Sequence, residues 1–174
     1  MKNLFLTGDI NIGKSTLIKK FINSEIGKNF NYSGFKTIPF FNDDKKSFII
    51  KYYNETTLKS KSNYEIVGLK KEKEKGFYGI TKGFETLGCE ILRDSLKKKH
   101  IVIMDELGFF ELQANNFKEL VLRNLDSDNF VLGVIKKKEN PFLKEIIKRE
   151  DVCVIEVSKE NREEKLLDIK KFFI

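Results

Sequence analysis

The sequence predicts an α/β protein with a mainly parallel β-sheet flanked by helices. Two observations favour this class. Short apolar runs typical of buried strands occur at residues 3–7, 101–104, 130–135 and 152–157. Between these runs, apolar residues repeat every three or four positions, as they do on one face of a helix. Strands that alternate with helices along a chain form parallel sheets, because each helix returns the chain to the same end of the sheet.

The helical patterns cover residues 17–26, 84–96, 117–125 and 166–169. The first is expected to end at Gly27, since glycine readily adopts the left-handed conformation that terminates helices. A further helix is expected to begin at Asn140-Pro141. Asparagine caps helix N-termini, and proline suits the first helical position because its missing N–H would have no partner there.

Residues 32–80 have a different pattern. Aromatic and β-branched runs predict strands at residues 35–41, 47–53, 64–69 and 77–80. Turn-forming residues at 42–45 separate the first two runs, and polar residues at 60–63 and 70–76 separate the others. We therefore expect one domain over residues 1–174, with a β-hairpin-rich insertion at about 32–80.

The composition excludes several classes of protein. Cys89 and Cys153 are too few for a disulfide framework, and with His100 as the single histidine a zinc site would lack ligands. No apolar run approaches the roughly 20 residues that span a bilayer, and the apolar run near the N-terminus is too short for a signal peptide. We expect a reduced, cytoplasmic protein that does not enter a membrane.

The formal charge of +7 is compatible with an anionic partner. The lysine runs at residues 70–75, 97–99 and 136–138 are short, and the first alternates with glutamate. We interpret them as solvated turns and element ends, so a nucleic acid is an alternative partner that the sequence does not favour. The alternative for residues 136–138, which follow the end of a strand, is that one of these lysines stabilises transition-state charge.

One motif carries specific chemistry. It matches the phosphate-binding pattern G-x-x-x-x-G-K-[ST] and reads Gly8-Asp9-Ile10-Asn11-Ile12-Gly13-Lys14-Ser15-Thr16. Glycines let the backbone wrap so that its N–H groups point at phosphate oxygens, and the following helix presents unpaired N–H groups. Lys14 is expected to neutralise the β- and γ-phosphates, and the Ser15 hydroxyl to bind Mg²⁺. An apolar strand precedes the motif and an amphipathic helix follows it, as this chemistry requires.

Two carboxylates follow the apolar strand at residues 101–104. Asp105 is expected to hold the shell of a Mg²⁺ ion, and Glu106 to orient or deprotonate the water that attacks the γ-phosphate. The alternative is that both are ordinary acidic residues at a strand end. Asp105-Glu106-Leu107-Gly108 also fits the D-x-x-G pattern of small GTPases, but the guanine-reading N-K-x-D is absent from the chain. No motif therefore encodes base specificity.

Taken in order, several segments resemble a known family. They are Gly8–Thr16, Gly34-Phe35-x-Thr37, Asp105–Leu112, Val131–Ile135, Asn140–Phe142, Arg149–Val152 and Asn161–Glu163. Together they are similar to the small P-loop nucleoside-triphosphatases first described from thermophiles, which include the vertebrate cancer-related nucleoside-triphosphatase. The resemblance implies a RecA-like sheet that hydrolyses ATP, GTP and other nucleoside triphosphates slowly, with little base preference.

The chain departs from the family pattern in three places. Asp9, Ile10 and Asn11 replace the usual x-P-G of the loop, and an acidic Asp9 would weaken phosphate binding unless it points away. Phe110 replaces the methionine of D-E-[IL]-G-x-M-E. Residues 38–41 replace the acidic and basic pair that usually follows G-F-x-T, so the middle of the chain is expected to differ in substrate or partner.

Two further residues each allow more than one interpretation. Glu111 either holds the loop after the acidic strand or contacts the metal shell, or it is a surface glutamate at a helix start. Arg162 follows the last strand, at the sheet edge where ligands bind in α/β proteins. It either contacts the nucleotide or belongs to the start of the last helix.

The sequence thus predicts Mg²⁺-dependent hydrolysis of nucleoside triphosphates, with Lys14 and Glu106 as catalytic residues. Without an obvious arginine finger, turnover is expected to be slow. A small-molecule or nucleoside kinase on the same core is the first alternative, although the four arginines form no clustered lid. A nucleotide-gated module that binds nucleic acid or protein is the second. The oligomeric state stays open.

Overall fold

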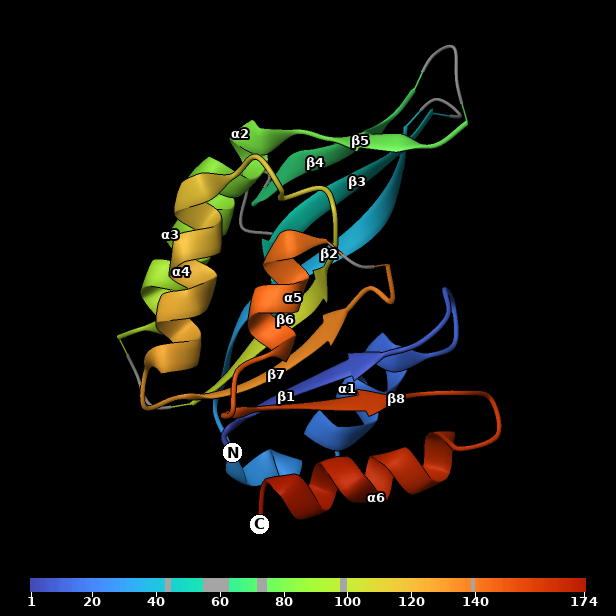
Figure 1. Cartoon of the computed structure of the whole chain (residues 1–174), viewed down its shortest axis with the longest axis vertical. Coiled ribbons are helices and arrows are strands. Elements are labelled where there is room, and N and C mark those ends of the chain that lie inside the picture. Colours follow the sequence, from blue (N-terminus) through green and yellow to red (C-terminus); the bar gives the residue numbers. More distant parts are fainter. Residues whose placement is uncertain (43–44, 55–62, 72–74, 98–99, 139) are drawn as a thin grey trace.

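The computed structural model describes residues 1–42, 45–54, 63–71, 75–97, 100–138 and 140–174 (Figure 1). Several predicted connections lie partly outside the described residues. These are the turn at 42–45, the polar segments at 60–63 and 70–76, and the lysine run at 97–99.

A single eight-stranded sheet forms the centre of the described structure, in the order β5-β4-β3-β2-β6-β7-β1-β8. Strands β2, β6, β7, β1 and β8 pair in parallel with one another in this order. Strands β5, β4, β3 and β2 pair antiparallel. The strands are β1 (Asn3–Thr7), β2 (Tyr32–Asn42), β3 (Lys45–Tyr52), β4 (Tyr64–Lys70), β5 (Phe77–Gly79), β6 (Ile101–Leu107), β7 (Phe130–Ile135) and β8 (Val152–Glu156).

Helices cover both faces of the sheet, which confirms the predicted α/β class (Figure 1). The helices α1 and α6 pack together on one face, and α3 and α4 pack together on the other. The helical elements are α1 (Lys14–Ile22), a 3₁₀ turn (Gly27–Asn29), α2 (Thr81–Gly83), a π-helix (Phe84–Gly88), α3 (Cys89–Ser95), α4 (Asn115–Asp126), α5 (Pro141–Ile147) and α6 (Arg162–Phe172).

The strand β6 shows why the apolar runs are continuous. Val102 and Met104 lie in the core beneath α3 and α4, whereas Ile101 and Ile103 lie in the core beneath α1. Successive side chains of a strand point to opposite faces, and here both faces are buried. The same alternation places the next residue, Asp105, on the α1 side of the sheet.

The segment expected as an insertion shares its first strand with the parallel sheet. Residues 32–36 of β2 pair in parallel with residues 101–105 of β6, and residues 35–42 pair antiparallel with β3. At eleven residues, β2 is long enough to do both. The predicted strands of this segment are present, and they extend the sheet instead of forming a separate layer.

Helix ends confirm one prediction and contradict another. The Asn140 side chain accepts a 2.9 Å hydrogen bond from the Leu143 N–H, and Pro141 is the first residue of α5, as expected. Helix α1 ends at Ile22, so the prediction that it continues to Gly27 is wrong. Gly27 is required for close packing, because a Cβ there would lie 2.0 Å from the Phe21 carbonyl oxygen.

Two smaller expectations concern the environment of the chain. No helix in the described part is long and apolar enough to cross a membrane. Cys89 and Cys153 are both free thiols.

Phe117 is the central aromatic side chain of the larger core. It projects from α4, is fully buried, and its ring centroid lies 5.4 Å from that of Phe35 and 4.9 Å from that of Phe84. It therefore connects α4 both to β2 and to the π-helix.

Replacing this side chain should destabilise the fold strongly. We expect Phe117→Ala to lower the free energy of unfolding by about 3–5 kcal/mol, because the truncation leaves a cavity between three elements. Urea denaturation followed by circular dichroism measures this change. Phe41→Ala is the matched control, since Phe41 is 66% exposed and its loss should change stability by less than about 1 kcal/mol. Equal effects of the two substitutions would contradict the assignment of the core.

Candidate active site

The loop between β1 and α1 is held in a tight backbone conformation. Gly13 has a φ of 98°, in the left-handed region that favours glycine, and it immediately precedes α1. Gly8 packs against the chain that follows β8, since a Cβ on Gly8 would lie 2.3 Å from the Val157 carbonyl oxygen. Both glycines of the predicted motif are thus required by the backbone geometry.

Lys14 closes the mouth of this loop. Its Nζ donates hydrogen bonds to the carbonyl oxygens of Gly8 (2.9 Å) and Asp9 (2.6 Å). Burial lowers the pKa of Lys14, while the nearby carboxylates of Glu106, Asp9 and Asp105 oppose that shift. The ammonium therefore lies where it would meet a phosphate chain wrapped by the loop.

Ser15 and Asp105 meet although 90 positions separate them. The Ser15 hydroxyl donates a 2.8 Å hydrogen bond to Asp105 Oδ1, which joins the start of α1 to the end of β6. Burial raises the pKa of Asp105 to about 6, and the Ser15 hydrogen bond and the ammonium groups of Lys36 and Lys14 oppose the rise. A buried carboxylate beside a hydroxyl is a pair of hard oxygen donors of the kind that binds Mg²⁺. The residues present therefore fit this ion.

No described group of three or more His, Cys, Asp and Glu side chains could by itself hold a metal ion. Mg²⁺ is typically bound through one or two protein oxygens together with substrate phosphates and water. Ser15 and Asp105 supply two oxygens of this kind.

Glu106 lies in a bulge at the end of β6. The pairing of β6 with β7 shifts between Asp105 and Leu107, and Glu106 has a φ of 90°, which non-glycine residues rarely adopt. Its carboxylate forms a 2.7 Å ion pair with Lys136, and its charge is the largest of those that raise the pKa of Lys14. The bulge thus breaks the regular alternation of the strand and brings both acidic residues toward Lys14.

Comparison with known proteins identifies the chain. The family model described as NTPase matches residues 3–170, nearly the whole chain. The chain belongs to this family. Its enzyme class is nucleoside-triphosphatase, and the resemblance seen in the sequence is confirmed.

Similar proteins come from distant organisms. The nucleoside-triphosphatase THEP1 of Thermotoga sp. (strain RQ2) is 32% identical, with 95% of this chain and 92% of that protein covered. The human cancer-related nucleoside-triphosphatase is also 32% identical, with 97% of this chain and 94% of that protein covered.

Two solved structures have the same fold. The crystal structure of THEP1 from Aquifex aeolicus matches with a TM-score of 0.71 and 26% identity, covering 96% of both chains. The solution structure of the human cancer-related enzyme matches with a TM-score of 0.74 and 25% identity, covering 98% of this chain and 96% of that one.

The remaining residues predicted for the site lie in the loop motif itself, except Arg162, which lies beside it. A Cβ on Gly13 would lie 3.5 Å from Arg162 Nη1, so the structure brings Arg162 to the loop. Asp9 extends into solvent, with its carboxylate 4.0 Å from Lys137 Nζ, so it does not point into the loop. Ile10 is 84% exposed, whereas Ile12 is buried beneath the loop. Asn11 has a φ of 60°, and Thr16 is exposed on α1.

The structure places two lysines in the site that were not assigned to it from the sequence. Lys36 pairs in register with Asp105 across β2 and β6, and its Nζ lies 3.3 Å from the Tyr53 carbonyl oxygen. Lys136, interpreted from the sequence as part of a solvated turn, holds Glu106 and lies 4.7 Å above the Phe109 ring centroid. The position of Lys36 within G-F-x-T was visible in the sequence, but its partner depends on strand register.

Glu111 holds the loop after β6, so its interpretation as a surface glutamate is wrong. It is 2% exposed and accepts a hydrogen bond from the Gly108 N–H. Burial raises its pKa to about 7. Hydrogen bonds from the backbone N–H groups of Glu111 and Gly108 and the ammonium of Lys136 oppose the rise. It supports the loop that begins directly after Glu106 and Leu107.

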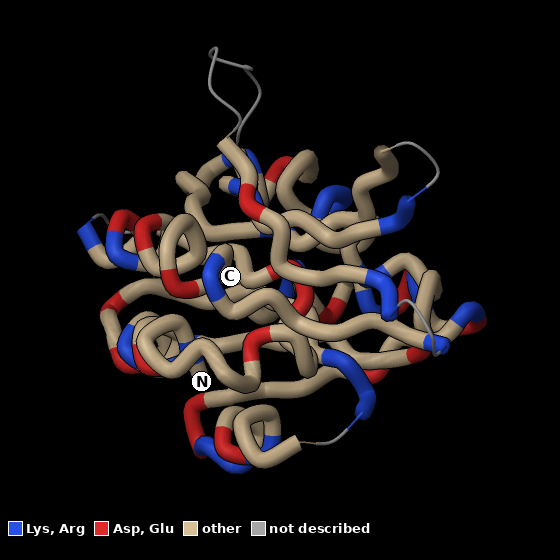
Figure 2. The backbone as a smooth tube through the Cα atoms, turned by 90° about the horizontal axis from the view of Figure 1, so that it is seen from above, with Lys and Arg blue, Asp and Glu red and all other residues tan. Residues whose placement is uncertain are grey.

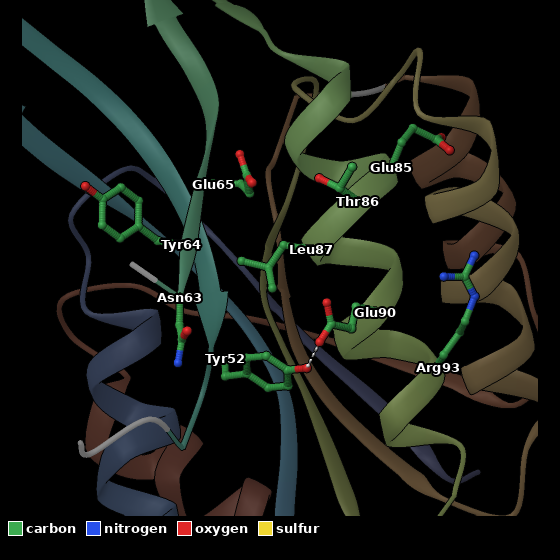
Figure 3. Close-up of a pocket in the computed structure, with 9 residues that line it drawn as sticks. All are labelled: Tyr52, Asn63, Tyr64, Glu65, Glu85, Thr86, Leu87, Glu90 and Arg93. Carbon is green, nitrogen blue, oxygen red and sulfur yellow. Dashed lines mark hydrogen bonds between the residues drawn. The ribbon is translucent and has the colours of Figure 1, made fainter. Parts of the chain in front are cut away.

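One hollow of the described structure lies away from the loop (Figure 3). It has a volume of about 550 Å³, and it lies between strands β3 and β4 and the helical segment that leads into α3. The Tyr52 hydroxyl donates a 3.2 Å hydrogen bond to Glu90 across it. No predicted site residue lines it, so we do not assign it to the nucleotide.

The burial of Glu111 predicts a pH dependence of stability. Its pKa rises from 4.5 in the unfolded chain to about 7 in the folded protein, so the folded protein keeps this proton to a higher pH than the unfolded chain does. Stability should therefore fall as the pH rises from about 4.5 to 7, by up to about 3 kcal/mol, and stay level above that.

We expect Glu111→Gln to remove most of this slope, because glutamine keeps the acceptor oxygen and does not ionise. Urea denaturation at pH 5 and pH 8, in the presence of a chelator that removes metal ions, measures the difference in the free energy of unfolding. Glu119→Gln, an exposed site on α4, is the control and should leave the slope unchanged. A Glu111→Gln protein with the wild-type slope would show that another group is responsible.

Proposed function

We propose that this NTPase hydrolyses ATP, GTP and other nucleoside triphosphates to the diphosphate and phosphate, with Mg²⁺ and with little base preference. The observation that carries the proposal is the convergence of four side chains at one edge of the sheet. Lys14, Ser15, Asp105 and Glu106 come from two segments about 90 residues apart, and hydrogen bonds or charge interactions link them.

The triphosphate would bind across the loop Gly8–Thr16. Backbone N–H groups at the start of α1 and the Lys14 ammonium bind the β- and γ-phosphates. Ser15 and Asp105 would hold Mg²⁺, which would supply positive charge against the phosphate oxygens. Arg162, beside Gly13, is placed to contact the nucleotide from α6.

Glu106 then positions the attacking water. Its carboxylate accepts a hydrogen bond and finally a proton from the water, whose oxygen bonds to the γ-phosphorus as the bond to the β–γ bridging oxygen breaks. Lys136 is a positioning residue, because its 2.7 Å ion pair holds the Glu106 carboxylate. Turnover should be slow. Of the four arginines, only Arg162 lies at the loop in the described structure, and it is exposed.

Two further parts of the proposal are the base preference and the cellular location. The residues brought together at the loop recognise phosphates and Mg²⁺, and no base-reading motif accompanies them. This supports broad use of nucleotides. The free thiols of Cys89 and Cys153 support a reducing compartment such as the cytoplasm.

Lys14→Ala tests the binding half of the proposal. We expect kcat/KM for phosphate release to fall at least about 100-fold with ATP, GTP, CTP and UTP alike, because the charge facing the phosphates is lost. Phosphate release with each triphosphate, with and without Mg²⁺, measures the effect. Lys19→Ala, an exposed site on the same helix, is the matched control. Strong wild-type selectivity for one base, or phosphate transfer to an added nucleoside, would instead favour a kinase.

Glu106→Gln tests the chemical half. We expect nucleotide affinity to be retained and kcat to fall by about 10²–10⁴, because the amide cannot accept the proton. Fluorescent-nucleotide titration measures binding, and single-turnover phosphate release measures chemistry. Wild-type rates in this variant would show that Glu106 is only a structural partner of Lys136.

A further inference from the structure

A second hollow lies beside the proposed active site and is rich in lysine. It has a volume of about 270 Å³ and is lined by residues from the end of β7 and from α5. We call it the lysine basin, and its residues are Lys136, Lys137, Lys138, Leu143, Lys144, Ile147 and Lys148.

The basin differs from the rest of the charged surface. Figure 2 shows lysine and arginine on all sides of the molecule, interspersed with acidic residues, so the net charge alone marks no face. In the basin five lysine side chains line one small hollow. Lys136 pairs with Glu106 and Lys137 with Glu156, each at 2.7 Å. This concentration of lysines around one hollow favours a polyanion as the partner.

Apolar side chains accompany these charges. Leu143 forms the buried floor of the basin, and Ile147 is 45% exposed although it is a large aliphatic side chain. Phe109, at 36% exposure, lies next to Lys136 at the edge nearest Glu106. Lysines that follow a phosphate backbone, together with exposed aromatic side chains on which bases stack, are features of proteins that bind single-stranded nucleic acid. A purely acidic peptide segment supplies the negative charge but no ring to lie against Phe109.

We propose that the lysine basin binds single-stranded nucleic acid, with its phosphates on the lysines and its bases against Ile147 and Phe109. This activity goes beyond nucleotide hydrolysis and uses a different part of the surface. Neither Lys14 nor Ser15 lines the basin. The basin nevertheless contains Lys136, which also holds Glu106, so a strand bound there would lie directly beside the proposed catalytic carboxylate.

The test uses the full chain and a fluorescein-labelled 12-nucleotide oligouridylate, with fluorescence anisotropy measured across a series of KCl concentrations. Each lysine–phosphate contact contributes about 0.7 to the slope of log K against log [KCl]. Lys144→Ala/Lys148→Ala should therefore reduce that slope by about 1.4 and weaken binding. Lys144→Arg/Lys148→Arg, which keeps both charges, should bind as the wild type does.

The matched control is Lys28→Ala/Lys171→Ala, which removes the same charge from exposed positions outside the basin. It should leave the slope unchanged. Lys14→Ala should also retain oligonucleotide binding, so that failure of the proposed hydrolysis and failure of the basin can be distinguished.

Three results would overturn the proposal. The first is no binding of the oligonucleotide at 50 mM KCl. The second is an equal loss of binding in the basin and control variants, which would mean that charge acts without a defined site. The third is equal or tighter binding of a 12-residue polyglutamate peptide, which would make the basin a docking site for an acidic protein.

Discussion

The arrangement of the site depends on one contact, the hydrogen bond from Ser15 to Asp105. Because β7 lies between β1 and β6 in the sheet, the loop after β1 must reach across the end of β7 to meet β6. Parallel pairing makes this feasible, since the carboxyl ends of all three strands lie at one edge. A register change in either pairing would separate the hydroxyl from the carboxylate.

Carboxyl groups and ammonium groups lie close together at this edge of the sheet. Burial raises the pKa of Asp105 to about 6 and that of Glu111 to about 7, so both carboxyls are poorly solvated. Lys14 donates hydrogen bonds to backbone carbonyl oxygens, and Glu106 forms an ion pair with Lys136. This arrangement favours a ligand that brings both a cation and phosphate oxygens, because the cation then faces the carboxylates and the phosphates face the ammonium groups.

The hairpins of β3–β5 contribute to the same edge, although their sequence departs from the family pattern. Phe110, from the loop that Glu111 holds, packs 5.1 Å from Phe48 of β3, measured between ring centroids. A Cβ on Gly79 of β5 would lie 2.1 Å from the Phe110 carbonyl oxygen, so the loop fits closely against the hairpins. The divergent middle of the chain thus supports the loop next to Glu106, and changes there would reach the site through packing.

The sequence alone determined the class of fold, and it predicted a loop with the phosphate-binding pattern and the pair of Asp105 and Glu106 as site residues, because these patterns depend on residues that are close together in the chain. Local pattern also predicted the start of α5 at Asn140. Only the tertiary structure decided that Lys36 faces Asp105, that a bulge redirects Glu106 toward Lys136, and that Glu111 is buried. The reason is that strand register and burial arise from pairing between segments far apart in sequence, and a shift of one residue would turn each side chain to the other face of the sheet.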